Sequence, residues 1–170
     1  HILIDDIPGV GKTSLALALS KAMTLQYNRV QFTPDVMPSD VTGFTMLNKK
    51  TGEFEYKQGA IICNLFLADE INRTSSKTQS ALLEAMEEGT VTVDSETHQL
   101  PVPFNVIATQ NPVGSIGTHM LPESQVDRFM FCISMGYPTV TDEVKMLKDR
   151  YCNNPLECVN SIINSKQLEE

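Results

Sequence analysis

The chain has 170 residues, of which 41% are hydrophobic and 20% are charged, and its net charge is −8. This length suits one domain with a substantial core and is too short for two ordinary domains. The acidic balance gives no support to broad nucleic-acid binding, and no apolar run approaches the roughly 20 residues that span a bilayer. We therefore expect a globular domain that neither binds nucleic acid nor inserts into a membrane.

Short apolar runs alternate with helix-like stretches along the chain. The runs that predict strands are residues 2–4, 30–32, 65–68, 104–108 and 129–133. The stretches that predict helices are residues 14–25, residues 76–88 and a final amphipathic helix with Val140, Val144, Leu147 and Tyr151 on one side. Strands that alternate with helices indicate an α/β fold with a mostly parallel sheet, here of five strands.

Apolar positions inside these elements predict which side chains are buried. The helix at 76–88 has an inward stripe of Ala81, Leu82, Ala85 and Met86. Cys63 and Cys132 lie in apolar runs and are expected to be core thiols. Free thiols suit a reducing compartment, so we expect a cytoplasmic protein.

Two further segments interrupt the alternation of strands and helices. Residues 45–57 predict a hairpin that turns near 49–52, and residues 90–103 predict a second hairpin with a polar turn at Asp94 and Ser95. Both segments would then be insertions. The alternative is that they are edge strands that extend the main sheet.

A glycine-rich loop follows the first predicted strand and precedes the first predicted helix. Its glycines allow backbone N–H groups to approach phosphate oxygens closely. Lys12 would reach the β- and γ-phosphates, and Thr13 would offer its hydroxyl to Mg²⁺. Asp6 stands where the general pattern of this loop has a glycine. The residues predicted to bind the nucleotide phosphates are Pro8, Gly9, Val10, Gly11, Lys12, Thr13 and Ser14.

Two carboxylates end the buried strand at residues 65–68. In an open parallel sheet, ligands bind at this carboxyl edge. Asp69 would bind Mg²⁺ beside Thr13, because this hard cation prefers oxygen ligands. Glu70 would orient and deprotonate the water that attacks the γ-phosphate. The alternative is a strand that ends in exposed acids, but a chain with a phosphate loop needs such an aspartate.

An amide and an arginine complete the candidate site. Asn111 ends another buried strand and would hydrogen-bond the γ-phosphate and the attacking water; the alternative is a turn-forming Asn-Pro pair. Residues 121–129 predict a short helix that carries Arg128, which would reach the γ-phosphate of a neighbouring subunit. The alternative for Arg128 is a salt bridge to Asp127 or Glu123.

Taken together, these motifs make the chain resemble the MoxR-type AAA+ ATPases. The matching segments are residues 6–13, 31–35, 38–43, 51–54, 67–73, 81–88, 108–112, 121–123 and 127–129. The resemblance implies a P-loop three-layer sandwich in which Asp69 and Glu70 are the Walker B pair and Asn111 is sensor 1. It also implies that Arg128 is the arginine finger, with Arg73 as the other candidate, and that the hairpins are the helix-2 insert and the pre-sensor hairpin.

The resemblance further implies a ring, usually a hexamer, that hydrolyses ATP with Mg²⁺. Relatives act as chaperone-like factors that mature client proteins, often with a partner that has a von Willebrand factor A domain. Residues 1–151 would form the α/β core, and residues 152–170 the linker and the beginning of a helical lid. Because the lid supplies part of the nucleotide site, we expect this chain alone to hydrolyse ATP poorly and to assemble weakly.

Two other functions stay open at this point. One is a nucleotide-gated switch that changes shape with ATP and hardly turns over. The other is a nucleic-acid motor of the helicase type, which the acidic balance and the scarcity of basic residues at 91–103 disfavour.

Overall fold

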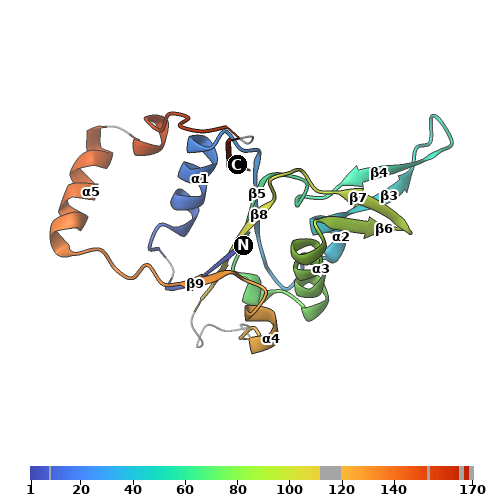
Figure 1. Cartoon of the computed structure of the whole chain (residues 1–170), viewed down its shortest axis with the longest axis horizontal. Coiled ribbons are helices and arrows are strands. Elements are labelled where there is room, and N and C mark those ends of the chain that lie inside the picture. Colours follow the sequence, from blue (N-terminus) through green and yellow to red (C-terminus); the bar gives the residue numbers. More distant parts are fainter. Residues whose placement is uncertain (8, 112–119, 153, 165–166, 169–170) are drawn as a thin grey trace.

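The centre of the fold is a parallel sheet of five strands (Figure 1). The computed structural model describes all residues except 8, 112–119, 153, 165–166 and 169–170. The strands are β1 (Ile2–Asp5), β2 (Tyr27–Gln31), β5 (Leu65–Asp69), β8 (Asn105–Gln110) and β9 (Phe131–Ile133). Their order is β2-β5-β8-β1-β9, and every neighbouring pair is parallel, which confirms the predicted α/β sheet.

Helices cover both faces of this sheet. On opposite faces lie α1 (Lys12–Ala22) and α3 (Ser76–Glu88), which gives three layers (Figure 1). The short helix α2 (Pro38–Thr42) packs against α3, α4 (Glu123–Val126) precedes β9, and α5 (Val140–Cys152) follows it. Two 3-10 turns span Ile71–Arg73 and Pro155–Glu157. Across the described residues, no helix combines the length and the apolar character needed to cross a membrane.

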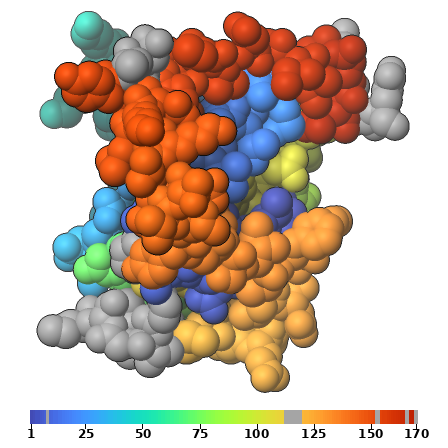
Figure 2. All heavy atoms as spheres, turned by 90° about the vertical axis from the view of Figure 1, so that its left-hand side faces the viewer, coloured from blue at the N-terminus to red at the C-terminus, as the bar shows by residue number. Residues whose placement is uncertain are grey.

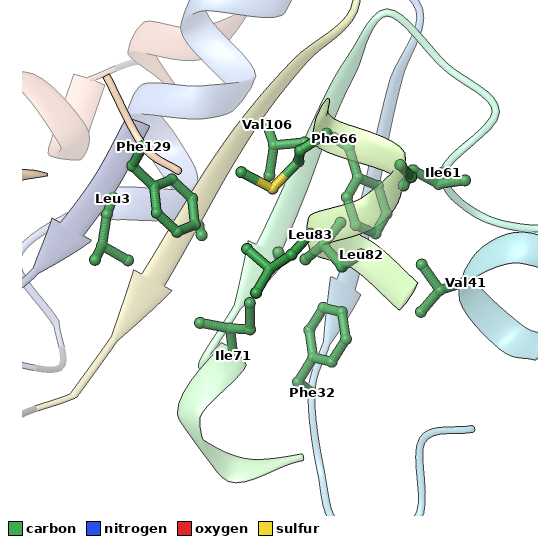
Figure 3. Close-up of a cluster of buried hydrophobic side chains, with 14 of the residues drawn as sticks. Leu3, Phe32, Val41, Ile61, Phe66, Ile71, Leu82, Leu83, Val106 and Phe129 are labelled. Carbon is green, nitrogen blue, oxygen red and sulfur yellow. The ribbon is translucent and has the colours of Figure 1, made fainter. Parts of the chain in front are cut away.

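The central strands are buried on both faces because their side chains alternate between two hydrophobic clusters. Leu65 and Leu67 of β5 pack toward α1, with Ile4, Ala16 and Ile107. The intervening residues of β5 pack toward α3, in a larger cluster that includes Leu3, Phe32, Phe66, Ala68, Ile71, Leu82, Leu83, Val106 and Ala108. Figure 3 shows Leu82 and Leu83 of α3 pointing into this larger cluster.

The two predicted hairpins are insertions. Strands β3 (Gly43–Leu47) and β4 (Phe54–Gln58) form one two-stranded sheet, and β6 (Thr90–Val93) and β7 (Glu96–Gln99) form another. The alternative that they extend the main sheet is therefore wrong. Asp94 and Ser95 both have positive φ, 48° and 69°, as a tight two-residue hairpin turn requires. The hairpins contact each other through Tyr56 and His98, whose stacked rings are 3.7 Å apart.

Several boundaries differ from those predicted, for local reasons. Strand β2 begins at Tyr27, earlier than the predicted residue 30, because its whole length pairs with β5. Helix α1 begins at Lys12 rather than residue 14, because Gly11 at φ 94° starts the helix. In α3, Leu83 is buried and Ala81 is only half-buried, since α3 packs against α2 as well as against the sheet.

The prediction that Cys132 is a core thiol is wrong. Cys132 lies on β9, which is the last strand of the sheet and pairs only with β1, and its side chain is exposed. The predicted amphipathic helix does form as α5, but its apolar residues Val140, Val144, Leu147 and Tyr151 are exposed. Figure 2 views the molecule from this side, with α5 in front of α1.

Truncating a core phenylalanine should destabilise the fold. We expect Phe66→Ala to lower the free energy of unfolding by about 3–5 kcal/mol, because the side chain is fully buried. The matched control Phe54→Ala alters a side chain that is 76% exposed and should cost about 0.5 kcal/mol or less. Urea denaturation measures both changes. Equal losses for the two variants would contradict the assignment of Phe66 to the core.

Candidate functional site

The candidate site forms where the carboxyl ends of three adjacent strands meet. Strands β5, β8 and β1 are neighbours in the sheet, and each runs toward the same edge. At that edge lie Asp69 and Glu70 from the end of β5, Asn111 directly after β8, and Asp6 directly after β1. The parallel topology thus brings together side chains from distant parts of the sequence, as predicted for such a sheet.

The glycine-rich loop occupies the end of β1. Gly9 and Gly11 have φ values of 91° and 94°, a left-handed conformation that L side chains rarely adopt. The conformation of Gly11 starts α1 at Lys12, so the first N–H groups of the helix are free of intrahelical partners. Thr13 and Ser14 lie half-buried in the first turn. Pro8, also predicted to bind phosphate, lies outside the described residues.

Lys12 is a buried cation at the centre of this edge. Its Nζ donates to the backbone carbonyl of Asp6 at 2.6 Å and to Oδ1 of Asn111 at 3.3 Å. Burial lowers the pKa of Lys12, and the negative charges of Asp69 and Asp6 act in the opposite direction. A buried ammonium needs such partners, because an isolated charge is costly away from water.

Asp69 is held by residues from the strands on either side of it. Oδ1 accepts a hydrogen bond from Thr109 Oγ1 at 2.7 Å, and Oδ2 forms an ion pair with Arg29 at 2.7 Å. The Thr109 hydroxyl also accepts from the backbone N–H of Glu70 at 2.9 Å. One side chain therefore fixes both members of the acidic pair.

A strained backbone and two hydrogen-bonded side chains orient the carboxylate of Glu70. Its φ of 59° is left-handed and unusual for a residue other than glycine. Oε1 accepts from Asn111 Nδ2 at 2.8 Å, and Oε2 pairs with Arg73 at 2.7 Å. Burial by itself raises the pKa of Glu70, but the bonds from Arg73 and Asn111 outweigh it, so the pKa lies below its ordinary value. The side chain is therefore an ionised carboxylate at neutral pH.

Asn111 connects Lys12 to Glu70 and is itself held in place. Its backbone carbonyl accepts from Asn72 Nδ2 at 3.1 Å, and its N–H donates to Asn72 Oδ1 at 3.4 Å. The contacts with Lys12 and Glu70 orient the Asn111 amide, with its oxygen toward the cation and its nitrogen toward the carboxylate.

The sequence analysis did not assign a role to three supporting residues, Arg29, Asn72 and Thr109. Thr109 lies beside Asp69 because Ala68 pairs with Ala108, a register that the structure shows and the sequence does not. The long reach of Arg29 across to Asp69 carries no sequence signal.

Arg128 is held outside this network. It follows α4 rather than lying in it, and it pairs with Glu87 of α3 at 3.0 Å. The salt-bridge partners considered from the sequence were Asp127 and Glu123, and the observed partner is neither of them. A role for Arg128 toward another subunit stays a prediction.

A cavity of about 540 Å³ adjoins the glycine-rich loop. Gly9, Val10 and Gly11 line one side, residues 135–138 line another, and α5 contributes Glu143, Met146, Leu147 and Arg150. Ligand cavities commonly measure about 300–1,000 Å³, so this one has room for a nucleotide.

The predicted magnesium ligands are Thr13 and Asp69. Among the described residues, no group of three or more His, Cys, Asp or Glu could hold a metal by itself. Mg²⁺ usually keeps several waters and takes one or two carboxylates together with substrate phosphates. Since both oxygens of Asp69 already have partners, the donor set suits an ion held mainly by phosphate and water.

Comparison with known proteins gives consistent matches. Residues 1–131 match the family described as ATPase family associated with various cellular activities (AAA). YeaC, an uncharacterized protein of Bacillus subtilis (strain 168), is 56% identical over 163 residues, which cover 96% of this chain and 51% of YeaC. Chaperone MoxR1 of Mycobacterium tuberculosis (strain ATCC 25618 / H37Rv) is 42% identical over 147 residues, which cover 86% of this chain and 39% of that protein.

A solved structure agrees with these matches. The protein is from Cytophaga hutchinsonii ATCC 33406 and is assigned as an ATPase. It superposes with a TM-score of 0.85 at 44% identity, over 98% of this chain and 50% of the other. The present chain thus spans about half the length of these relatives, or less. By family match, fold and relatives, the chain belongs to the AAA family of ATPases and to its MoxR type.

Proposed function

We propose that this chain binds ATP with Mg²⁺ at the carboxyl edge of the sheet and hydrolyses it. The proposal rests on one observation: hydrogen bonds connect Lys12 to Asn111 and Asn111 to Glu70, beside a loop in which two glycines have a left-handed backbone. This arrangement supplies a cation and N–H groups for phosphate and, next to them, a carboxylate for an attacking water.

Phosphate binding would use groups that are already in place. Lys12 would exchange its bonds to Asp6 and Asn111 for phosphate oxygens, which compensate its charge more fully than a carbonyl and an amide do. The free N–H groups at the start of α1 would complete the cradle. Thr13 and Asp69 would hold the Mg²⁺, which neutralises charge on the phosphates when bound.

Hydrolysis would use Glu70 as the general base. The water oxygen attacks the γ-phosphorus while its proton passes to the Glu70 carboxylate, and the bond to the β-phosphate oxygen breaks to release ADP. Each oxygen of Glu70 accepts one hydrogen bond, from Asn111 and from Arg73, and keeps a second lone pair that could receive the proton of the water. The bonds from Arg73 and Asn111 lower the pKa of Glu70 and so weaken it as a base, which favours a second candidate, a switch that binds nucleotide and turns over slowly.

The wider function rests on the relatives. A relative named Chaperone MoxR1 supports a chaperone-like role for this chain. The resemblance to the MoxR-type ATPases further implies a ring, client proteins and a partner with a von Willebrand factor A domain. In such a ring, Arg128 would leave Glu87 and reach the γ-phosphate of the neighbouring subunit. The division into a core at 1–151 and a lid that begins within 152–170, and the cytoplasmic location, stay predictions.

Removing the buried cation should weaken nucleotide binding. We expect Lys12→Ala to raise the Kd for ATP at least about tenfold, because it removes a charge-assisted contact to phosphate. The control Lys50→Ala removes an exposed lysine from the turn between β3 and β4 and should leave the Kd unchanged. Isothermal titration with MgATP measures both. An unchanged Kd in Lys12→Ala would remove Lys12 from the phosphate site.

Neutralising the candidate base should separate binding from turnover. We expect Glu70→Gln to lower the rate of phosphate release by roughly 10²–10⁴, the usual contribution of a general base, with ATP still bound. Glu84→Gln, an exposed position on α3, is the matched control. If Glu70→Gln binds ATP and turns it over at the original rate, Glu70 is not the base. If the full-length protein binds ATP without turnover, the switch is the better description.

A site shared between subunits predicts complementation. Glu70→Gln subunits keep Arg128, and Arg128→Ala subunits keep Glu70, so a mixed ring should contain some intact sites. With full-length subunits, we expect ATPase activity in the mixture to exceed that of either variant alone. No recovery at any mixing ratio would contradict a role for Arg128 across the subunit interface.

A further inference from the structure

Asp6 joins two parts of the chain that lie far apart in sequence. It follows β1 directly, and its side chain is buried at the end of the sheet. Its Oδ2 accepts from the N–H of Met135 at 2.6 Å, from the N–H of Gly136 at 2.7 Å and from Ser134 Oγ at 3.2 Å. Its Oδ1 accepts from the N–H of Ile7 at 2.8 Å.

Residues 134–136 are the beginning of the connection from β9 to α5. Gly136 has a φ of 68°, and in this conformation its N–H and that of Met135 meet at the same carboxylate oxygen. The backbone carbonyl of Asp6 meanwhile accepts from Lys12. Asp6 is therefore in contact with the phosphate-binding lysine through its main chain and with the connection through its side chain.

The carboxylate of Asp6 is bound by the connection, and its negative charge also favours the charged form of Lys12. Its carboxylate faces backbone N–H groups of the connection, and the bond from Gly136 is the main reason that the pKa of Asp6 lies below its ordinary value. An ionised carboxylate is a stronger acceptor for these N–H groups than a neutral side chain. This arrangement explains how an acid can replace the glycine that the general phosphate-loop pattern has at this position.

The cavity beside the loop has these same two parts as walls. Gly9, Val10 and Gly11 form one wall, and the connection at 135–138 forms another. We propose that Asp6 is a positioning residue that fastens the connection to the end of β1, so that the phosphate loop and the connection line one nucleotide cavity at a fixed spacing. This inference rests on the proposed function, because it assumes that the cavity takes a nucleotide.

The proposal places the two ends of the nucleotide against different walls of the cavity. Phosphates would contact the loop, whereas the ribose and base would lie against the connection and α5. The side chain of Asp6 should therefore matter for a nucleotide and not for a bare polyphosphate. Asp6→Asn is a suitable change because it keeps the main-chain carbonyl that Lys12 contacts. The amide has a single acceptor oxygen, so it cannot serve both Ile7 and the connection.

Hydrogen exchange and ligand binding test the proposal together. In the empty protein, we expect Asp6→Asn to speed amide exchange at Met135 and Gly136 about tenfold or more. We expect the Kd for ADP to rise about tenfold, and the Kd for inorganic tripolyphosphate to change less than about twofold. Asp35→Asn is the matched control: it makes the same change at an exposed position outside the lining of the cavity, and it should change neither measurement.

A second variant covers the case that Asp6→Asn does not fold. Gly136→Ala adds a Cβ that meets no atom within 4 Å, but the positive φ of this position is strained for alanine. This variant should therefore shift the backbone of the connection, while Asp6 and the residues of the loop are unchanged. It should give the same selective loss of ADP affinity. Unchanged exchange in Asp6→Asn, or equal losses for ADP and tripolyphosphate, would overturn the role of Asp6. If the unaltered chain binds no ADP, the proposed function fails first and the positioning role fails with it.

Discussion

The burial of one lysine is the constraint on which the candidate site depends. Lys12 is fixed to the sheet edge by the short loop after β1, and its ammonium group has little access to water. A charge in that position requires acceptors and compensating negative charge from the surrounding strands. Asp6 supplies a carbonyl, Asn111 supplies an amide oxygen, and the carboxylates of Asp69 and Glu70 lie close enough to favour the charged form.

The acidic and amide side chains are in turn held by a second set of contacts. Thr109 bridges Asp69 and Glu70, Asn72 fixes the main chain of Asn111, and arginines occupy the remaining carboxylate oxygens. Groups with so many partners are already oriented, which suits a site that stabilises charge without having to reorganise. The same density of contacts means that a phosphate at Lys12 would replace existing bonds, beside a cavity that is already open.

The rigid centre contrasts with two exposed regions at its ends. The hairpin of β3 and β4 presents Phe44, Leu47 and Phe54 to solvent, and the region from β9 through α5 presents a larger apolar surface. The sheet and α3 share a continuous cluster of buried side chains, and no described residue of β3, β4, β9 or α5 belongs to it. The cavity beside the glycine-rich loop lies at the boundary, because the loop after β1 forms one wall and α5 forms another.

Local sequence patterns predict the main elements and the candidate site residues. They sufficed for the alternation of strands and helices, for helix α3 at its observed bounds, and for the glycine loop, because period and turn residues are local properties. The same patterns indicated Lys12, Asp69, Glu70 and Asn111.

The partners of these residues follow from the folded chain and not from local patterns. Arg29, Asn72 and Thr109 reach the site across strands, Arg128 pairs with Glu87, and the apparent misfit at Asp6 proves to hold the connection to α5. Such contacts depend on strand order and register, which join residues about 40 to 130 positions apart and leave no periodic signal in the sequence.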